Sequence, residues 1–140
     1  MRAFEHEASR KQGGERLPTI LIAEDNEDLR GMLSEFLGAH GYSVLEAADG
    51  RAAVESAARE RPDLVVMDLG MPGLDGLSAV AEIKRRDPAR MPPVIIVSAY
   101  DQLEYRTEAI AAGCVGFLTK PLDPPELLKT IGLLLRADED

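Results

Sequence analysis

Five polar side chains lie directly after short apolar runs of the sequence, and their types could bind a metal ion and a phosphoryl group. They are the carboxylates of Glu24, Asp25 and Asp68, the hydroxyl of Ser98 and the ammonium of Lys120. Clustered carboxylates repel one another unless a cation lies between them, and an all-oxygen ligand set that leaves room for water favours Mg²⁺. A carboxylate can also act as a nucleophile, so Asp68 is a candidate site for an aspartyl phosphate.

The other two side chains could assist the same chemistry. Phosphoryl transfer requires stabilisation of the charge on the equatorial oxygens, which Lys120 and Ser98 could supply together with the metal ion. Each residue also has a structural alternative, because Glu24 and Asp25 could cap a helix, Ser98 could satisfy a strand end and Lys120 could be solvated. Their shared position at the ends of apolar runs favours a functional site.

The apolar runs predict short strands that are buried on both faces and alternate with helices. The expected strands are 20–23, 43–47, 64–68, 94–97 and 115–119, and the expected helices are 28–40, 50–61, 74–86, 102–112 and 124–136. Five alternations of strand and helix predict an α/β fold, with a doubly wound five-stranded parallel sheet and helices on both faces. In the strand order 2-1-3-4-5, the ends of the first and third strands meet at the switch point, where such sheets bind ligands.

Length and composition limit the function classes. The chain has 140 residues, a formal net charge of −9 and one cysteine, Cys114. An acidic surface disfavours direct binding to nucleic acid, and a single cysteine excludes an intramolecular disulfide framework and suits the reducing cytoplasm. We expect a flexible charged leader over 1–18, one folded domain over 19–136, a short acidic tail over 137–140 and no membrane segment. Cys114 is expected to fill the core.

Four stretches carry a resemblance to a known family: ILIAEDNEDLR, DLVVMDLGMPGLDG, VIIVSAY and GFLTKP. In their order and spacing they are similar to the receiver domain of two-component response regulators, the chemotaxis-regulator-like family with a flavodoxin-like fold, over Thr19 to about Arg136. The resemblance implies that Asp68 is the phosphoacceptor, contacted by Ser98 and Lys120 once it carries a phosphoryl group. It also implies a Mg²⁺ site made of Asp25, Asp68, the backbone carbonyl of Gly70 and, through a bound water, Glu24.

The same resemblance implies partners and a switch. A histidine kinase or phosphotransfer protein would donate the phosphoryl group to Asp68. Ser98 would then move toward that group, and Phe117, the expected aromatic switch, would rotate into the vacated space. The surface formed by 102–112, 115–119 and 124–136 would respond by controlling a partner protein or forming a homodimer. The Lys120–Pro121 bond is expected to be cis.

Some positions leave the family pattern open. Gly70 has no side chain to place or block a hydrolytic water, and Tyr100 lies two residues after Ser98, so the sequence does not fix the phosphate lifetime. Phe117 lacks a hydroxyl, so the switch must work through packing. On the last helix, Leu128 and Leu133 are expected to lie outside the apolar face and to hint at a partner surface.

Other functions are weighed against this interpretation. A haloacid-dehalogenase-type aspartyl phosphatase needs a second acid two residues after its nucleophile, where this chain has Gly70. A flavodoxin-like flavin carrier needs a Ser/Thr/Gly phosphate loop, whereas the first loop here is acidic. A degenerate receiver is disfavoured by the complete set of site residues. We therefore expect a non-enzymatic, stand-alone response regulator that catalyses only its own phosphorylation and dephosphorylation, with a module of a hybrid kinase or larger regulator as the alternative.

Overall fold

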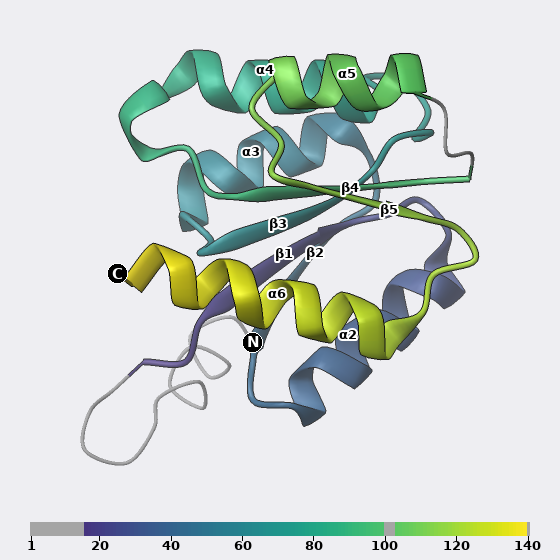
Figure 1. Cartoon of the computed structure of the whole chain (residues 1–140), viewed down its shortest axis with the longest axis vertical. Helices are drawn as coiled ribbons and strands as arrows, with labels where there is room; N and C mark the ends of the chain where they lie inside the picture. Colours follow the sequence, from purple (N-terminus) through teal and green to yellow (C-terminus); the bar gives the residue numbers. More distant parts are fainter. Residues whose placement is uncertain (1–15, 100–102, 140) are drawn as a thin grey trace.

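The structure is a computed structural model that describes residues 16–99 and 103–139, which form a sheet between two helical layers (Figure 1). All strand pairs are parallel, and the strand order β2-β1-β3-β4-β5 confirms the predicted fold class. The elements are β1 (Thr19–Ala23), α2 (Glu27–Ala39), β2 (Ser43–Ala47), α3 (Gly50–Glu60), β3 (Leu64–Asp68), α4 (Gly76–Arg86), the 3₁₀ turn η1 (Pro88–Arg90), β4 (Val94–Ser98), α5 (Leu103–Ala111), β5 (Gly116–Thr119) and α6 (Pro124–Glu139). The expectations for the leader up to residue 15, for Tyr100 and for residue 140 fall outside the described residues.

The sheet separates two apolar clusters because successive side chains of a strand point to opposite faces. In β3, Val65 and Met67 pack on the side of α3, α4 and α5, whereas Leu64 and Val66 pack on the side of α2 and α6. The central strands β1, β3 and β4 are buried along their whole length. This burial explains why the sequence shows continuous apolar runs there instead of an alternating pattern.

The register aligns the carboxyl ends of the strands. Ala23, the last residue of β1, pairs with Met67 of β3, so Glu24 follows β1 beside Asp68. Asp68 pairs in turn with Val97, and Ser98 pairs with Thr119. The polar residues that follow these strands are therefore brought to one edge of the sheet.

Side-chain caps set the starts of three helices. Asn26 accepts from Leu29 N, Asp49 from Ala52 N and Asp75 from Ser78 N. Since a cap residue lies outside the helix, α4 begins at Gly76, two residues later than predicted. Neither Glu24 nor Asp25 caps α2, which removes the structural alternative considered for them.

The last helix differs from the prediction at its end and on its surface. It continues to Glu139, three residues beyond the expected Arg136, so most of the expected tail is helical. The expectation that Leu128 lies outside the apolar face is wrong, because Leu128 is partly buried against the α2–α6 cluster. Leu133 is exposed, as expected.

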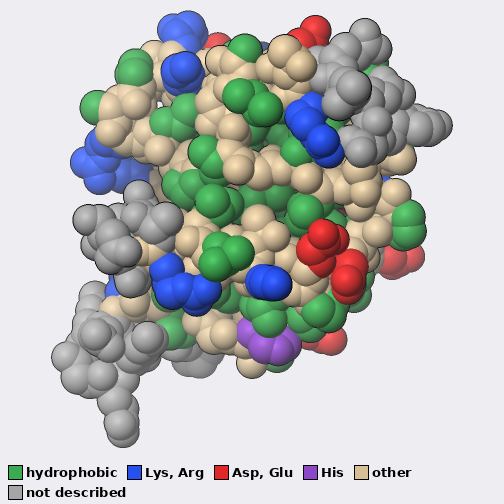
Figure 2. All heavy atoms as spheres, viewed as in Figure 1, with side chains coloured by type: hydrophobic (Ala, Val, Ile, Leu, Met, Phe, Trp, Pro, Cys, Tyr) green, Lys and Arg blue, Asp and Glu red, His purple; other side chains and the backbone are tan. Residues whose placement is uncertain are grey.

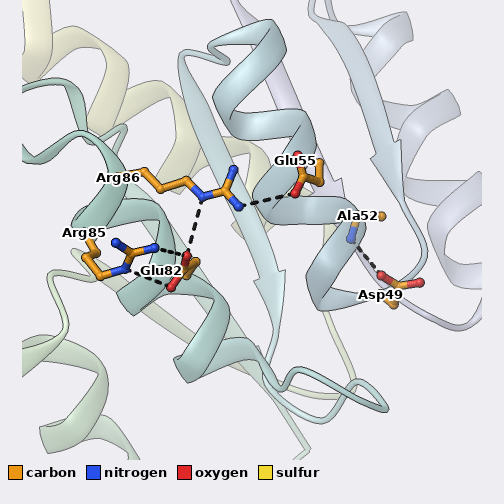
Figure 3. A network of polar contacts seen from close by, with 6 residues as sticks. All are labelled: Asp49, Ala52, Glu55, Glu82, Arg85 and Arg86. Atoms are coloured by element: carbon orange, nitrogen blue, oxygen red, sulfur yellow. Dashed lines mark hydrogen bonds and ion pairs between the residues drawn. The ribbon is translucent and has the colours of Figure 1, made fainter.

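A polar network joins α3 to α4 on the far side of the sheet from α2 and α6 (Figure 3). The Arg86 guanidinium lies 3.3 Å from Glu55 Oε2 of α3 and 3.5 Å from Glu82 Oε2 of its own helix. Arg85 donates to the same Glu82 carboxylate. Side chains therefore connect the two helices beyond their apolar contact. Across residues 16–99 and 103–139, every helix is too short or too polar to cross a lipid bilayer.

Candidate functional site

Three carboxylates converge at the carboxyl edge of the sheet. Glu24 and Asp25 follow β1, and Asp68 ends β3. One carboxylate oxygen from each lies within 4.8 Å of the others. Glu24 is only 3% exposed and Asp68 only 5% exposed, whereas Asp25 faces solvent. The structure thus brings together the acids that the sequence placed at this edge.

Lys120 extends from the end of β5 to two of these acids. Its Nζ lies 3.3 Å from Glu24 Oε1 and 3.4 Å from Asp68 Oδ1. Burial on its own would lower the pKa of Lys120, but the carboxylates of Asp68 and Glu24 outweigh it and raise that pKa above its usual value. Burial and, to a smaller extent, the neighbouring Asp68 carboxylate raise the pKa of Glu24 above its usual value, against the opposing effects of the Asn26 N–H and Lys120. Lys120 is therefore held as a fixed positive charge beside Asp68.

Backbone groups orient both buried carboxylates. Gly70 N donates to Asp68 Oδ1 at 3.2 Å, and Asn26 N donates to Glu24 Oε2 at 3.0 Å. The start of α4 lies close to the end of β3, since a Cβ built on Gly76 would lie 2.5 Å from the Asp68 carbonyl oxygen. By contrast, a Cβ built on Gly70 would have no heavy atom within 4 Å. The loop after Asp68 is thus tightly packed at Gly76 and open at Gly70.

The donor set suits a hard divalent cation. Its side-chain ligands are all carboxylate oxygens, and the Lys120 ammonium pairs with two of the three carboxylates, those of Glu24 and Asp68. Burying Glu24 and Asp68 as anions without further positive charge is unfavourable. Exposed Asp25 leaves one side of the cluster open to water, which Mg²⁺ commonly retains as ligand. Glu24, Asp25 and Asp68 therefore fit the predicted Mg²⁺ site, and Gly70 lines the same cleft.

Ser98 and Phe117 lie on the strands next to Asp68. Ser98 is buried at the end of β4 and lines the cleft that holds Asp68 and Lys120, and its carbonyl accepts from Lys120 N at 2.6 Å. The Lys120–Pro121 bond is cis, as predicted. The Phe117 ring packs against the cluster beneath α3, α4 and α5, and the Arg106 guanidinium carbon lies 5.0 Å from its centroid. An arginine of α5 thus covers the residue expected to act as the switch.

These side chains surround a cleft of about 650 Å³ that extends beyond the predicted site. Its far wall contains Tyr105 and Glu108 of α5, which sequence reasoning missed, as it missed Arg106. Both are exposed polar residues of a helix, and the apolar pattern of so short a helix does not reveal which side faces a cleft. A second cavity, of about 560 Å³ between α3 and η1, contains none of the predicted site residues.

Comparison with known proteins gives concordant matches. The sequence profile described as "Response regulator receiver domain" matches residues 20–132. The chain is 39% identical over 115 residues to the transcriptional regulatory protein PdtaR of Mycobacterium tuberculosis, covering 81% of this chain and 55% of that protein. It is 39% identical over 116 residues to Protein PilH of Pseudomonas aeruginosa, covering 83% of this chain and 96% of that protein.

Solved structures show the same similarity. The chemotaxis protein CheY4 of Vibrio cholerae superposes with a TM-score of 0.80 at 31% identity, over 84% of this chain and 98% of that one. A receiver domain of a Francisella response regulator gives a TM-score of 0.79 at 30% identity, and the match covers 86% of this chain and 98% of that one. The chain spans about half the length of the regulators PdtaR and PrrA, at 55% and 50%.

Proposed function

The chain belongs to the response regulator receiver domain family, and from this premise we propose that Asp68 accepts a phosphoryl group from a histidine kinase or phosphotransfer protein. The observation that carries the proposal is the convergence at one edge of the sheet. Asp68 lies 3.4 Å from Lys120 Nζ and within 4.8 Å of two further carboxylates. A buried carboxylate in that setting has both the nucleophilic oxygen and the nearby charges that phosphoryl transfer requires.

In the proposed reaction, a carboxylate oxygen of Asp68 attacks phosphorus while the phosphorus–nitrogen bond of a donor phosphohistidine breaks. The electron pair of that bond returns to the imidazole nitrogen. Lys120 is positioned to neutralise charge on the phosphoryl oxygens, and the buried Ser98 hydroxyl lines the same cleft. Attack of water on phosphorus would later release inorganic phosphate and restore Asp68, so the chain would catalyse only its own modification.

Glu24, Asp25, Asp68 and the carbonyl of Gly70 would hold Mg²⁺, Glu24 through a water. When bound, the ion supplies positive charge that offsets the repulsion between the acids and the incoming phosphoryl group. Lys120 already pairs with Glu24 and Asp68. Once Asp68 is phosphorylated, the Lys120 ammonium would interact with the phosphoryl group as well as with these carboxylates. The N–H of Gly70 orients the unmodified Asp68 carboxylate by donating to its Oδ1.

We further propose that phosphorylation acts on a partner protein through the surface formed by α5, β5 and α6. Exposed large apolar side chains lie in α5, just before β5 and in α6: Tyr105, Ile110, Val115 and Leu133. Figure 2 shows apolar side chains gathering across the middle of the face between α5 and α6. A phosphoryl group at Asp68 would draw Ser98 toward it and allow Phe117 to turn inward, which shifts a pre-existing equilibrium of this surface.

The proposal also covers whether the domain acts alone or within a larger protein, and where in the cell it acts. Protein PilH matches over 96% of its length, which supports a regulator composed of little more than this domain. The 55% coverage of PdtaR supports the alternative of a module within a larger regulator. We place the protein in the cytoplasm because its single Cys114 is a free, buried thiol and because a histidine kinase is its proposed donor.

The test of this function is labelling with acetyl phosphate in the presence of Mg²⁺, followed by intact-mass measurement. The wild type should gain one phosphoryl group, and Asp68→Asn should gain none because the amide is not nucleophilic. Asp87→Asn, which removes an exposed carboxylate beside η1, is the matched control and should be labelled normally. Labelling of Asp68→Asn, or of the wild type equally well without Mg²⁺, would contradict the proposal. A phosphotransfer screen against histidine kinases would then identify the donor.

A further inference from the structure

Part of the lining of the cleft comes from two helices. Asp75 and Leu77 at the start of α4 form one part, and Tyr105 and Glu108 of α5 form the other. None of these four residues takes part in the proposed acceptance of the phosphoryl group. A phosphodonor that reaches Asp68 must nevertheless enter the space they enclose.

Glu108 differs in its surroundings from Glu24, Asp68 and Asp75, and it is exposed like Asp25, the candidate metal ligand in the same lining. Glu24 and Asp68 each pair with Lys120. The Asp75 carboxylate accepts hydrogen bonds from Ser78 N and Ser78 Oγ at the start of α4. Within residues 16–99 and 103–139, the Glu108 carboxylate has neither an ion pair nor a hydrogen bond. It therefore adds a negative charge to the cleft that no side chain among the described residues pairs with.

We propose that Glu108 selects phosphodonors by charge. Its carboxylate repels small, highly charged donors such as acyl phosphates, so that they reach Asp68 more slowly than donors of lower charge. This inference rests on the proposed function of Asp68. It assigns to α5 a specificity-determining residue that neither binds the metal ion nor contributes to the switch.

The size of the effect follows from Coulomb's law. For charges on the order of 8 Å apart in a water-like medium, each unit of donor charge changes the rate roughly twofold, so a dianion changes it roughly fivefold. At pH 7 acetyl phosphate is a dianion, whereas phosphoramidate is mainly a monoanion. The two donors therefore differ in charge while they deliver the same phosphoryl group.

The experiment compares initial rates of Mg²⁺-dependent phosphorylation of the wild type and Glu108→Gln with each donor, at equal ionic strength. We expect the substitution to raise the rate roughly fivefold with acetyl phosphate and roughly twofold with phosphoramidate. The gain with acetyl phosphate should shrink at high salt because the cleft is open to solvent. Glu35→Gln, which removes the same charge from an exposed site on α2, should leave both rates unchanged.

Equal gains with both donors, unchanged rates or a loss of rate in Glu108→Gln would overturn this inference. An equal gain from Glu35→Gln would also overturn it, since overall charge would then explain the effect. A wild type that neither donor labels would instead contradict the proposed function of Asp68. The two failures are therefore distinguishable.

Discussion

Helices α3 and α4 cover the same face of the sheet as α5, but they are held there differently (Figure 1). In α4, Ala79 and Val80 are completely buried and Ile83 is only 7% exposed. In α5, Ala109 is the only buried residue among those whose side chains are described, and Ile110 is 64% exposed. The α3–α4 pair is thus fixed by apolar burial and by the Arg86 ion pairs, whereas the described side chains of α5 bury far less apolar surface.

This difference bears on where a signal can arise. Moving a helix away from a sheet costs roughly the free energy of the apolar surface that it exposes. Helix α5 carries Glu108 in the cleft that holds Asp68 and carries Arg106 against the Phe117 ring. A charge added at Asp68 would therefore act on the part of this layer that is least costly to move. The α3–α4 pair would serve as the fixed reference.

The largest expected effect comes from a matched truncation in the two helices. Ile83→Ala in α4 should destabilise the fold by about 3 kcal/mol, because it removes a buried side chain and leaves a cavity. Ile110→Ala in α5 should change stability by less than about 0.5 kcal/mol. Urea unfolding of both variants measures the difference. Similar losses would show that α5 is anchored as firmly as α4.

The next effect concerns the thiol beneath α5. Cys114 is 6% exposed, its N–H donates to the Ala109 carbonyl of α5, and burial raises its pKa to about 11. At pH 8 this lowers its thiolate fraction about a hundredfold relative to an exposed thiol. Reaction with an aromatic disulfide reagent should be slower by at least that factor in the folded protein than in urea, with Cys114→Ser as blank. A fast reaction without urea would mean that α5 leaves the core more readily than its burial implies.

The smallest effect concerns the polar connection between α3 and α4. Arg86→Met should cost less than about 1 kcal/mol, because the ion pairs of Arg86 are partly exposed. Arg85→Met, which breaks only the contact with Glu82 within α4, is the control. A double-mutant cycle of Arg86→Met and Glu55→Gln isolates the bond between the helices. A coupling well above 1 kcal/mol would show that this network, more than apolar burial, holds the pair together.

Sequence reasoning predicted most of the fold because the central strands are buried on both faces. A continuous apolar run gave the strand 64–68 its observed bounds, the edge strand 43–47 was also predicted with its observed bounds, and the Asp49 cap placed the start of α3 correctly. The predicted bounds were wrong at the start of α4 and at the end of α6, where neighbouring residues favour different helix ends. Asp75 takes the cap position of α4, and the polar residues after Arg136 still extend α6.

The residues of the candidate site that directly follow strands were predictable from the sequence. Glu24, Asp25, Asp68 and Lys120 lie close together because parallel strands align their carboxyl ends, which a sequence pattern reveals. The contributions of α5 were not predictable. Arg106 and Glu108 are polar residues on a short helix, and their orientation depends on how that helix lies over the sheet.

Two of the glycines that follow Asp68, Gly70 and Gly76, have opposite tolerances. A Cβ at residue 76 would lie 2.5 Å from the Asp68 carbonyl oxygen, so any larger amino acid there would force α4 away from β3, whereas a Cβ at residue 70 would meet no heavy atom within 4 Å. Directed variation aimed at the persistence of the phosphorylated state can therefore begin at residue 70 without endangering the architecture. Residue 76 should remain glycine in any such library.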